Sequence, residues 1–258
     1  MGAEFIDYIV TDKVLVPDEY KHHLSEKVIE MPNSYMVTDN TREISNQIMN
    51  RSQQGIPKYA FVFCCFNNAY KISPREFDIW MRLLHKVDGS VLWLRNTNKW
   101  SSENLCNEAK KRGIKPSRLL FADPIKLEDH LARHQLANLF LDTFNFCAHS
   151  TAIDALWAGL PVITKIGHSF SARVSSSLLT AIDMPELITN SEDEYEQLAL
   201  ELAKNPDRLA DIKQRLQRNR LSTPLFNTHQ FTKDLERGYQ KAHENYLSGS
   251  QPTNINVE

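Results

Sequence analysis

Hydrophobic and polar positions alternate with two different periods between residues 59 and 190. Short apolar runs, typical of buried strands, are followed by longer stretches in which apolar residues recur every three or four positions, as in amphipathic helices. The runs that predict strands are 60–65, 90–95, 119–122, 139–142 and 161–164. The stretches that predict helices are 74–86, 102–112, 127–134, 150–158 and the residues after Ser171. This alternation predicts an α/β fold, a Rossmann-like parallel sheet with helices on both faces.

The beginning of the chain carries a weaker pattern. Residues 5–10 predict a short strand, and residues 18–30 predict a helical segment. Residues 33–57 are rich in Asn, Ser, Thr and Gln, and they close on Gly55-Ile56-Pro57. We expect a linker there, with one possible helix, and a new core after it.

The last third of the chain predicts helices. Ser191 begins a capping box with Glu194, and Asn205-Pro206 places a helix cap before a proline at the first helical position. A final helix is expected near 228–246. Residues 248–258 begin with Ser-Gly-Ser-Gln-Pro-Thr-Asn, and they predict a flexible tail.

Composition and charge exclude some classes of partner. The 258 residues are 41% hydrophobic and 24% charged, with a net charge of −2 and interspersed charges, so we expect no nucleic-acid partner. No apolar stretch approaches the roughly 20 residues that span a bilayer, and no signal-peptide pattern opens the chain, so we expect no membrane partner. The four cysteines form no CxxC pair, which fits reduced thiols and a cytoplasmic location.

The glycines, histidines and acidic residues exclude several kinds of site. The eight glycines are too dispersed for a GxGxxG fingerprint or a GxxxxGK(S/T) loop, and neither GxSxG nor HExxH occurs. His130 and His134 lie four residues apart on a predicted helix and could share a metal, but no third ligand accompanies them. No Asp-x-Asp pair is present to chelate a metal-bound diphosphate. We expect no metal, so protein groups would have to neutralise any bound diphosphate.

The helix that begins at His149-Ser150-Thr151 is the strongest candidate for a binding site. Backbone N–H groups at a helix start, with two hydroxyls beside them, form an anion site that needs no metal. Asp154 lies one turn further along, where it could face the same ligand and accept hydrogen bonds from ribose hydroxyls. The alternative is that Ser150 or Thr151 only caps the helix and that Asp154 only complements its dipole.

Three further loops follow predicted strands and carry polar residues. They contain Asn67, Asn68 and Lys71 after 60–65, Lys126, His130 and Arg133 after 119–122, and residues 165–173 with Gly167 after 161–164. Each has a simpler reading, as turn asparagines, a solvated lysine or a packed histidine. Loops after parallel strands meet at the edge of the sheet where such sheets bind ligands. The presence of polar residues in all of these loops favours a phosphate-containing ligand at that edge.

Five segments, in this order along the chain, resemble glycosyltransferase family 41, the O-linked N-acetylglucosamine transferase and SPINDLY family. They are FVFCCFNNAYKISPREFDIW, SVLWLR, LFLDTFNFCAHSTAIDALWAGLPVIT, SARVSSSLL and TPLFNTHQF. The resemblance runs from about Phe5 to Tyr246. It implies a GT-B enzyme, in which two Rossmann-like lobes enclose a nucleotide sugar, usually behind tetratricopeptide repeats that present protein acceptors.

The resemblance also divides the chain into parts. Residues 1–57 are similar to the end of the N-terminal lobe and the linker, residues 58–247 to the C-terminal lobe that binds the nucleotide sugar, and residues 248–258 are left as the flexible tail. The repeats and most of the N-terminal lobe, with the histidines proposed there for acceptor activation, have no counterpart in the chain. A lone lobe of this kind is expected to bind a donor but to be catalytically incomplete.

The reaction that the resemblance implies is inverting and needs no metal. A protein Ser or Thr hydroxyl attacks the sugar of UDP-GlcNAc at its anomeric carbon, and UDP departs. The expected partners are therefore a nucleotide sugar and a protein acceptor, the latter held through the absent lobe and repeats. The alternatives are a non-catalytic nucleotide-binding module, a SPINDLY-like enzyme that uses GDP-fucose, and another GT-B transferase that acts on a lipid or small glycan.

The resemblance assigns one group of residues to the diphosphate and ribose. Lys71 matches the family lysine that contacts the diphosphate, and His149-Ser150-Thr151 matches a His-Thr-Thr phosphate turn, with serine for the first threonine. Charge develops on the departing diphosphate, so Lys71 and His149 are the expected catalytic residues. Asp154 matches the aspartate that binds the ribose.

A second group is assigned to the base. His130 matches a histidine of the nucleotide pocket, and Arg133 matches an arginine near the uracil. Asn68 stands where the transferase has glutamine, and asparagine is the SPINDLY-like residue at this position. Leu127 replaces a lysine near the base, with Lys126 adjacent to it. These departures leave the identity of the nucleotide and of the sugar open.

Overall fold

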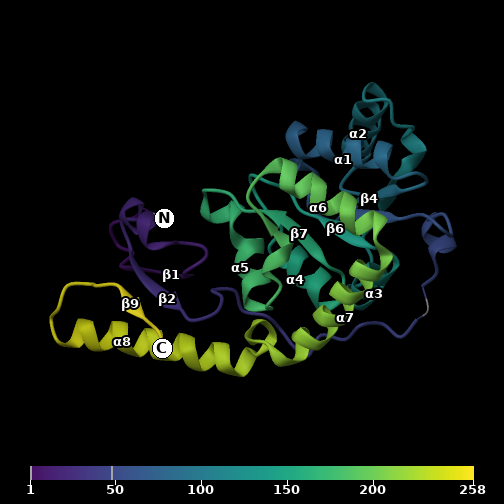
Figure 1. Ribbon diagram of the computed structural model, residues 1–258. Coiled ribbons are helices and arrows are strands. Elements are labelled where there is room, and N and C mark those ends of the chain that lie inside the picture. The colour runs from purple at the N-terminus through teal and green to yellow at the C-terminus, as the bar shows by residue number, and fades with distance from the viewer. Residues whose placement is uncertain (1, 48) are drawn as a thin grey trace.

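The computed structural model describes residues 2–47 and 49–258, and the strands in these ranges form two sheets (Figure 1). The large sheet has the strand order β5-β4-β3-β6-β7-β8, and the small sheet has the order β1-β2-β9. Neighbouring strands in both sheets run parallel. In Figure 1 the small sheet lies to the left of the large one, and helix α8 (Thr228–Leu247) runs below it.

The strands of the large sheet are mostly buried. They are β3 (Val62–Cys65), β4 (Val91–Arg95), β5 (Leu119–Ala122), β6 (Leu139–Leu141), β7 (Val162–Lys165) and β8 (Ile188–Thr189). Because helices cover both faces, these strands are continuous apolar runs rather than alternating ones. The predicted parallel sheet is confirmed, and the five predicted strands have bounds within two residues of those expected.

Helices cover the two faces of the large sheet. They are α1 (Pro74–Lys86), α2 (Lys99–Lys111), α3 (Leu127–Arg133), α4 (Ser150–Trp157), α5 (Val174–Ala181), α6 (Glu192–Lys204) and α7 (Pro206–Ser222). Connections between parallel strands are right-handed, so α1 and α2 lie on one face and α4 and α5 on the other. Helix α6 returns to pack on α1. Among the helices that the structure describes, none combines the length and the apolar character that a membrane crossing requires.

The predicted starts of α6 and α7 are confirmed by their caps. The Ser191 hydroxyl accepts a hydrogen bond from the N–H of Glu194, and the Asn205 side chain accepts one from the N–H of Arg208. Each bond satisfies an N–H group that has no acceptor within its own helix. The two helices therefore begin where the sequence predicts.

The prediction of a helical segment at 18–30 is wrong in its second half. A 3₁₀ turn covers Asp18–His23, but strand β2 (Lys27–Met31) follows and pairs with β1 (Tyr8–Asp12). Strand β2 forms because it pairs with its neighbours and is buried, and its residues show no clear two-residue alternation. Its apolar residues can therefore be mistaken for one face of a helix. In the linker 33–57, a short 3₁₀ helix covers Arg51–Gln54, and the domain division at residue 57 stays a prediction.

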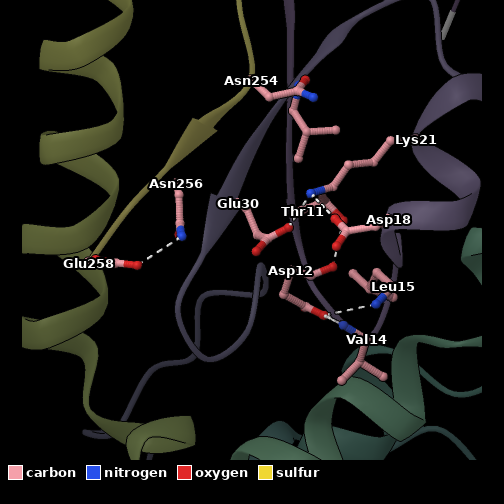
Figure 2. Close-up of polar contacts among 11 residues, drawn as sticks. Thr11, Asp12, Val14, Leu15, Asp18, Lys21, Glu30, Asn254, Asn256 and Glu258 are labelled. Atoms are coloured by element: carbon pink, nitrogen blue, oxygen red, sulfur yellow. Dashed lines mark hydrogen bonds and ion pairs between the residues drawn. The ribbon is translucent and has the colours of Figure 1, made fainter.

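The prediction of a flexible tail is wrong for the last residues. Strand β9 (Ile255–Asn256) pairs with β2, with Asn256 opposite Glu30 (Figure 2). The side chain of Val257 is fully buried. Just before this strand, the Asn254 side chain accepts a hydrogen bond from the N–H of Val28 at 2.9 Å. The end of the described chain thus completes the small sheet.

Gly238 lies where α8 packs on the small sheet. A methyl group on it would come within 2.7 Å of Ile29 Cγ2 and 3.1 Å of Val257 Cγ2. We expect Gly238→Ala to lower the free energy of unfolding by about 1–3 kcal/mol, although alanine by itself favours a helix by about 1 kcal/mol. Urea unfolding measures the change, with exposed Gln240→Ala on the same helix as the control. A Gly238→Ala protein as stable as the parent would contradict this close packing.

Candidate functional site

The strand order of the large sheet reverses between β3 and β6. The chain moves outward from β3 through β4 to β5, and outward the opposite way from β6 through β7 to β8. The loops that follow β3 and β6 therefore start side by side at the carboxyl edge of the sheet, which is where sheets of this topology bind ligands. Lys71 lies in the first of these loops and His149 at the end of the second, as the sequence predicts.

Asn67 connects the two loops. Its buried side chain donates a hydrogen bond to Thr143 Oγ1 at 2.9 Å and accepts one from Thr151 Oγ1 at 2.5 Å. The hydroxyl at the start of α4 is thus held by the loop after β3. Sequence reasoning predicts only a turn residue here, although an asparagine close behind a buried strand is a signal for such a role.

Asp142, the residue after β6, is a buried carboxylate that shapes the second loop. It accepts hydrogen bonds from the N–H groups of Thr143 at 2.8 Å and Ala148 at 2.6 Å, and from the Thr164 hydroxyl at 2.8 Å. Burial raises the pKa of Asp142, while these donors act to lower it. The bonds hold residues 143–148 in one conformation, so that the chain enters α4 in a fixed direction. Sequence reasoning missed this residue, although a carboxylate at the end of an apolar run is a usable signal.

Lys71 ends a 3₁₀ turn and reaches across the switch point of the sheet. Its ammonium donates to the carbonyl of Cys147 at 3.0 Å and lies 4.1 Å from the ring centroid of Phe146. Both contacts belong to the loop that leads into α4. The structure thus brings together the two groups predicted to hold a phosphate, a lysine and a helix start.

His149 occupies the N-cap position of α4, and its side chain packs between two loops. The imidazole stacks on Phe146 with ring centroids 4.7 Å apart, and Nε2 lies 3.3 Å from the carbonyl of Ser171, to which it can only donate. Burial lowers the pKa of His149 below its ordinary 6.5; the bond to Ser171 opposes this, and the charge of Lys71 adds to it. The ring is therefore neutral at pH 7, with its lone pair on Nδ1.

Ser150 and Thr151 are the first two residues of α4 rather than its cap. The reading in which either hydroxyl caps the helix is therefore wrong, because the cap position belongs to His149 and the Thr151 hydroxyl bonds Asn67 instead. N–H groups in the first turn of a helix have no acceptor within it. Those of Ser150 and Thr151 are consequently suited to an anion, as predicted for a phosphate turn.

Asp154, one turn further along α4, forms an ion pair with Arg42. Arg42 Nη1 lies 2.5 Å from Asp154 Oδ1, and each side chain is 14% exposed. Burial raises the pKa of Asp154, and the hydrogen bond and charge of Arg42 lower it. Nothing in the sequence pattern singles out Arg42, because it lies in the predicted linker, 112 residues away from Asp154.

His130 and Arg133 form a second cluster near the end of β5. Arg133 Nε donates to His130 Nδ1 at 2.9 Å, and Arg133 Nη1 donates to the carbonyl of Asp123 at 2.7 Å. Burial lowers the pKa of His130 to about 4, and the charges of Arg133 and Arg95 add to the effect. The neutral ring accepts on Nδ1, so it carries its proton on Nε2 and is a donor there.

The other predicted residues make fewer contacts. Asn68 begins the turn that carries Lys71, and its carbonyl accepts from the N–H of Lys71 at 2.9 Å. Lys126 and Leu127 are exposed at the start of α3. In residues 2–47 and 49–258, no group of three or more His, Cys, Asp or Glu side chains is placed to hold a metal. A hollow of about 880 Å³ is lined by the linker and α7, for example by Ser45, and by none of the predicted site residues.

His134 lies behind the His130 cluster and is fully buried. Its Nδ1 donates to the carbonyl of His130 at 2.7 Å, and burial lowers the pKa of His134 to about 3. In the unfolded chain this side chain takes up a proton near pH 6.5, whereas in the folded protein it stays neutral down to about pH 3. Its contribution to stability is therefore fully present above pH 6.5 and is lost as the pH falls toward 3.

We expect His134→Gln to flatten this dependence on pH. One proton fewer is taken up on unfolding, so the slope of the unfolding free energy against pH should fall by about 1.4 kcal/mol per pH unit between roughly pH 6 and 4. Urea unfolding at several pH values measures the slope, and exposed His243→Gln is the control. An unchanged slope in His134→Gln would show that His134 is not held neutral.

Curated proteins with related sequences cover nearly the whole chain. The family model of glycosyl transferase family 41 matches residues 1–51 and 41–235. The Arabidopsis thaliana protein named "Probable UDP-N-acetylglucosamine–peptide N-acetylglucosaminyltransferase SEC" is 36% identical over 262 residues, which cover 99% of this chain and 27% of that protein. A UDP-N-acetylglucosamine–peptide N-acetylglucosaminyltransferase of Caenorhabditis elegans is 34% identical over 228 residues, or 88% of this chain and 19% of that protein. The chain thus spans about a quarter of the length of these relatives, or less.

Solved structures share the fold. A variant of the O-GlcNAc transferase of Thermobaculum terrenum matches with a TM-score of 0.81 and 27% identity, over 91% of this chain and 44% of that one. The glycosyltransferase WaaG of lipopolysaccharide biosynthesis matches with a TM-score of 0.63 and 15% identity, over 88% of this chain and 61% of that one, a likeness that shows the fold alone. The predicted GT-B type of fold is confirmed. From the family model and the curated relatives together, the chain belongs to glycosyl transferase family 41.

Proposed function

We propose that this chain is the donor-binding lobe of an inverting glycosyltransferase that moves N-acetylglucosamine from UDP-GlcNAc to Ser or Thr of proteins without a metal. The observation that carries the proposal is the meeting of Lys71 with the start of α4 at the switch point of the large sheet. The printed names of the relatives, as UDP-N-acetylglucosamine–peptide N-acetylglucosaminyltransferases, support this class of donor and acceptor.

In the proposed reaction, the acceptor hydroxyl attacks the anomeric carbon from the side opposite the diphosphate. A carbon–oxygen bond forms to the acceptor while the bond to the phosphate oxygen breaks, UDP leaves with the electron pair, and the acceptor proton passes to a base. Lys71 and the N–H groups of Ser150 and Thr151 would stabilise the negative charge that grows on the diphosphate. His149 contributes by fixing the direction in which α4 begins.

The nucleoside is proposed to extend from the diphosphate toward the end of β5. His130, with its proton on Nε2 and Arg133 behind it, suits a carbonyl oxygen of the base, and Asp154 suits the ribose. Lys126 and Asn68 complete the proposed donor site. Because Asn68 stands where the transferases have glutamine, a GDP-fucose donor is the second candidate.

Protein acceptors are proposed to be presented by segments outside this chain, namely an N-terminal lobe and tetratricopeptide repeats. The isolated chain is therefore expected to bind the donor and to transfer little sugar. We also propose a cytoplasmic location and no nucleic-acid or membrane partner. The support is the net charge of −2 and the free thiols of the described cysteines.

Thermal unfolding in the presence of ligands tests the proposal. UDP or UDP-GlcNAc at a hundred times its dissociation constant should stabilise the chain by about 2.7 kcal/mol, and EDTA should not reduce this effect. GDP and GDP-fucose are the comparison ligands, and uridine without phosphate is the control. Stabilisation by the guanine nucleotides alone would favour the second candidate, and no response to any nucleotide would overturn both.

A further inference from the structure

The Arg42 guanidinium is fixed on two sides. Its Nε donates to the carbonyl of Asp39 at 3.2 Å, and its Nη1 donates to Asp154 Oδ1 at 2.5 Å. Its backbone is fixed as well, because the indole N–H of Trp157 donates to the Arg42 carbonyl at 3.1 Å. The linker therefore holds this arginine against α4, on the same helix that carries the proposed phosphate turn.

The pair of Arg42 and Asp154 is poorly explained as a stabilising contact. Both side chains are only 14% exposed, and Arg42 Nη2 is buried without a hydrogen-bond partner among the described residues. Burying two charges carries a large desolvation penalty, which is offset only when the remaining donors are satisfied. A buried pair with an unsatisfied donor contributes little to the free energy of folding. We therefore look for the role of Arg42 in its effect on the Asp154 carboxylate.

The two carboxylate oxygens of Asp154 have different surroundings. Oδ1 accepts the bond from Arg42, whereas Oδ2 accepts no hydrogen bond from any residue in 2–47 or 49–258. Oδ2 is not among the fully buried side-chain atoms that lack a partner in these ranges, so part of its surface is accessible to solvent. Arg42 thus fixes the rotation of the carboxylate through Oδ1, and its hydrogen bond and charge oppose the rise in the pKa of Asp154 that burial causes, so Oδ2 is left to accept a hydrogen bond from a ligand.

We propose that Arg42 is a positioning residue for the donor: it holds Asp154 through Oδ1 so that Oδ2 accepts a hydrogen bond from the ribose diol of the nucleotide. This inference rests on the proposed function and adds to it a residue from the linker. Arg42 does not contact the diphosphate in this arrangement. Its loss should therefore affect recognition of the ribose and leave recognition of the phosphates intact.

Binding of UDP and of 2′,3′-dideoxy-UDP to the same variants tests the inference by calorimetry. The parent chain should bind UDP about tenfold or more tightly than the dideoxy compound, the effect of one hydrogen bond to a charged group. In Arg42→Met this ratio should fall to near one, with binding of the dideoxy compound almost unchanged. Arg42→Gln, which retains a neutral N–H donor on a shorter side chain, should restore part of the ratio.

The control is Arg82→Met, which removes an arginine that pairs with Glu196 between α1 and α6, away from the site. It should keep the parent ratio. A parent chain that does not bind UDP would overturn the proposed function and this inference with it. A parent chain that prefers UDP, with Arg42→Met and Arg42→Gln both keeping that preference, would overturn this inference alone. If Arg42→Met does not fold, Arg42→Gln provides the test: a ratio of UDP to dideoxy-UDP affinity as high as in the parent would overturn the inference, and a reduced ratio would support it.

Discussion

Replacing Lys71 by methionine is expected to weaken UDP binding about a hundredfold, while binding of uridine changes little. A hundredfold loss corresponds to about 2.7 kcal/mol, which is in the range of a hydrogen bond between charged groups. Methionine fills a similar space and keeps the contact with Phe146, so the loss reports the charge rather than a packing defect. Isothermal titration calorimetry with UDP and with uridine measures both affinities.

The matched control for this experiment is Lys110→Met, because Lys110 is exposed on α2, far along the chain from either loop of the switch point. It should bind UDP as the parent does. Equal losses for UDP and uridine in Lys71→Met would mean that the substitution disturbs the whole site. Unchanged UDP binding would mean that the diphosphate does not lie beside Lys71.

Removing the Asp142 carboxylate is expected to lower the free energy of unfolding by about 3–5 kcal/mol in Asp142→Ala, because each buried donor that loses its acceptor costs about 1–3 kcal/mol. The N–H groups of Thr143 and Ala148 and the Thr164 hydroxyl would all lose their acceptor inside the protein. Asp142→Asn should lose less, because the amide oxygen keeps part of the acceptor role. Urea unfolding measures these values.

The control for Asp142 is Asp211→Ala, at an exposed position of α7, where the change should stay within about 0.5 kcal/mol. Because Asp142 shapes the loop that leads to His149, its alanine variant should also lose UDP binding where it remains folded. A loss of stability below about 1 kcal/mol would show that the loop does not depend on this carboxylate.

The elements of the large sheet could be predicted because each carries its own local signal. Strands buried on both faces are continuous apolar runs, and α6 and α7 begin at the capping residues Ser191 and Asn205. The small sheet could not be predicted in this way. Its strand β9 has two residues and thus no period, and Asn254 contacts Val28 across 226 residues of sequence.

The residues of the candidate site likewise fall into those with a local sequence signal and those defined by distant contacts. Lys71 and the start of α4 could be predicted, because they follow strands whose carboxyl ends meet at one edge of a parallel sheet. The partners of Asn67 and Arg42 could not be predicted, since they lie 84 and 112 residues away and only the folded chain determines which loops meet. Residues that position others are therefore the ones that sequence reasoning misses.

The small sheet joins residues that a ribosome releases far apart in time. Strand β2 can pair with β1 early, but its other edge waits for residues 255 and 256. At about 5–20 residues per second, this delay lasts roughly ten seconds or longer. The large sheet, whose strands lie between residues 62 and 189, can form during that interval. Of the two sheets, the small one therefore completes after the large one during synthesis, and until residues 255 and 256 emerge the edge of β2 that pairs with β9 stays open to chaperones and proteases.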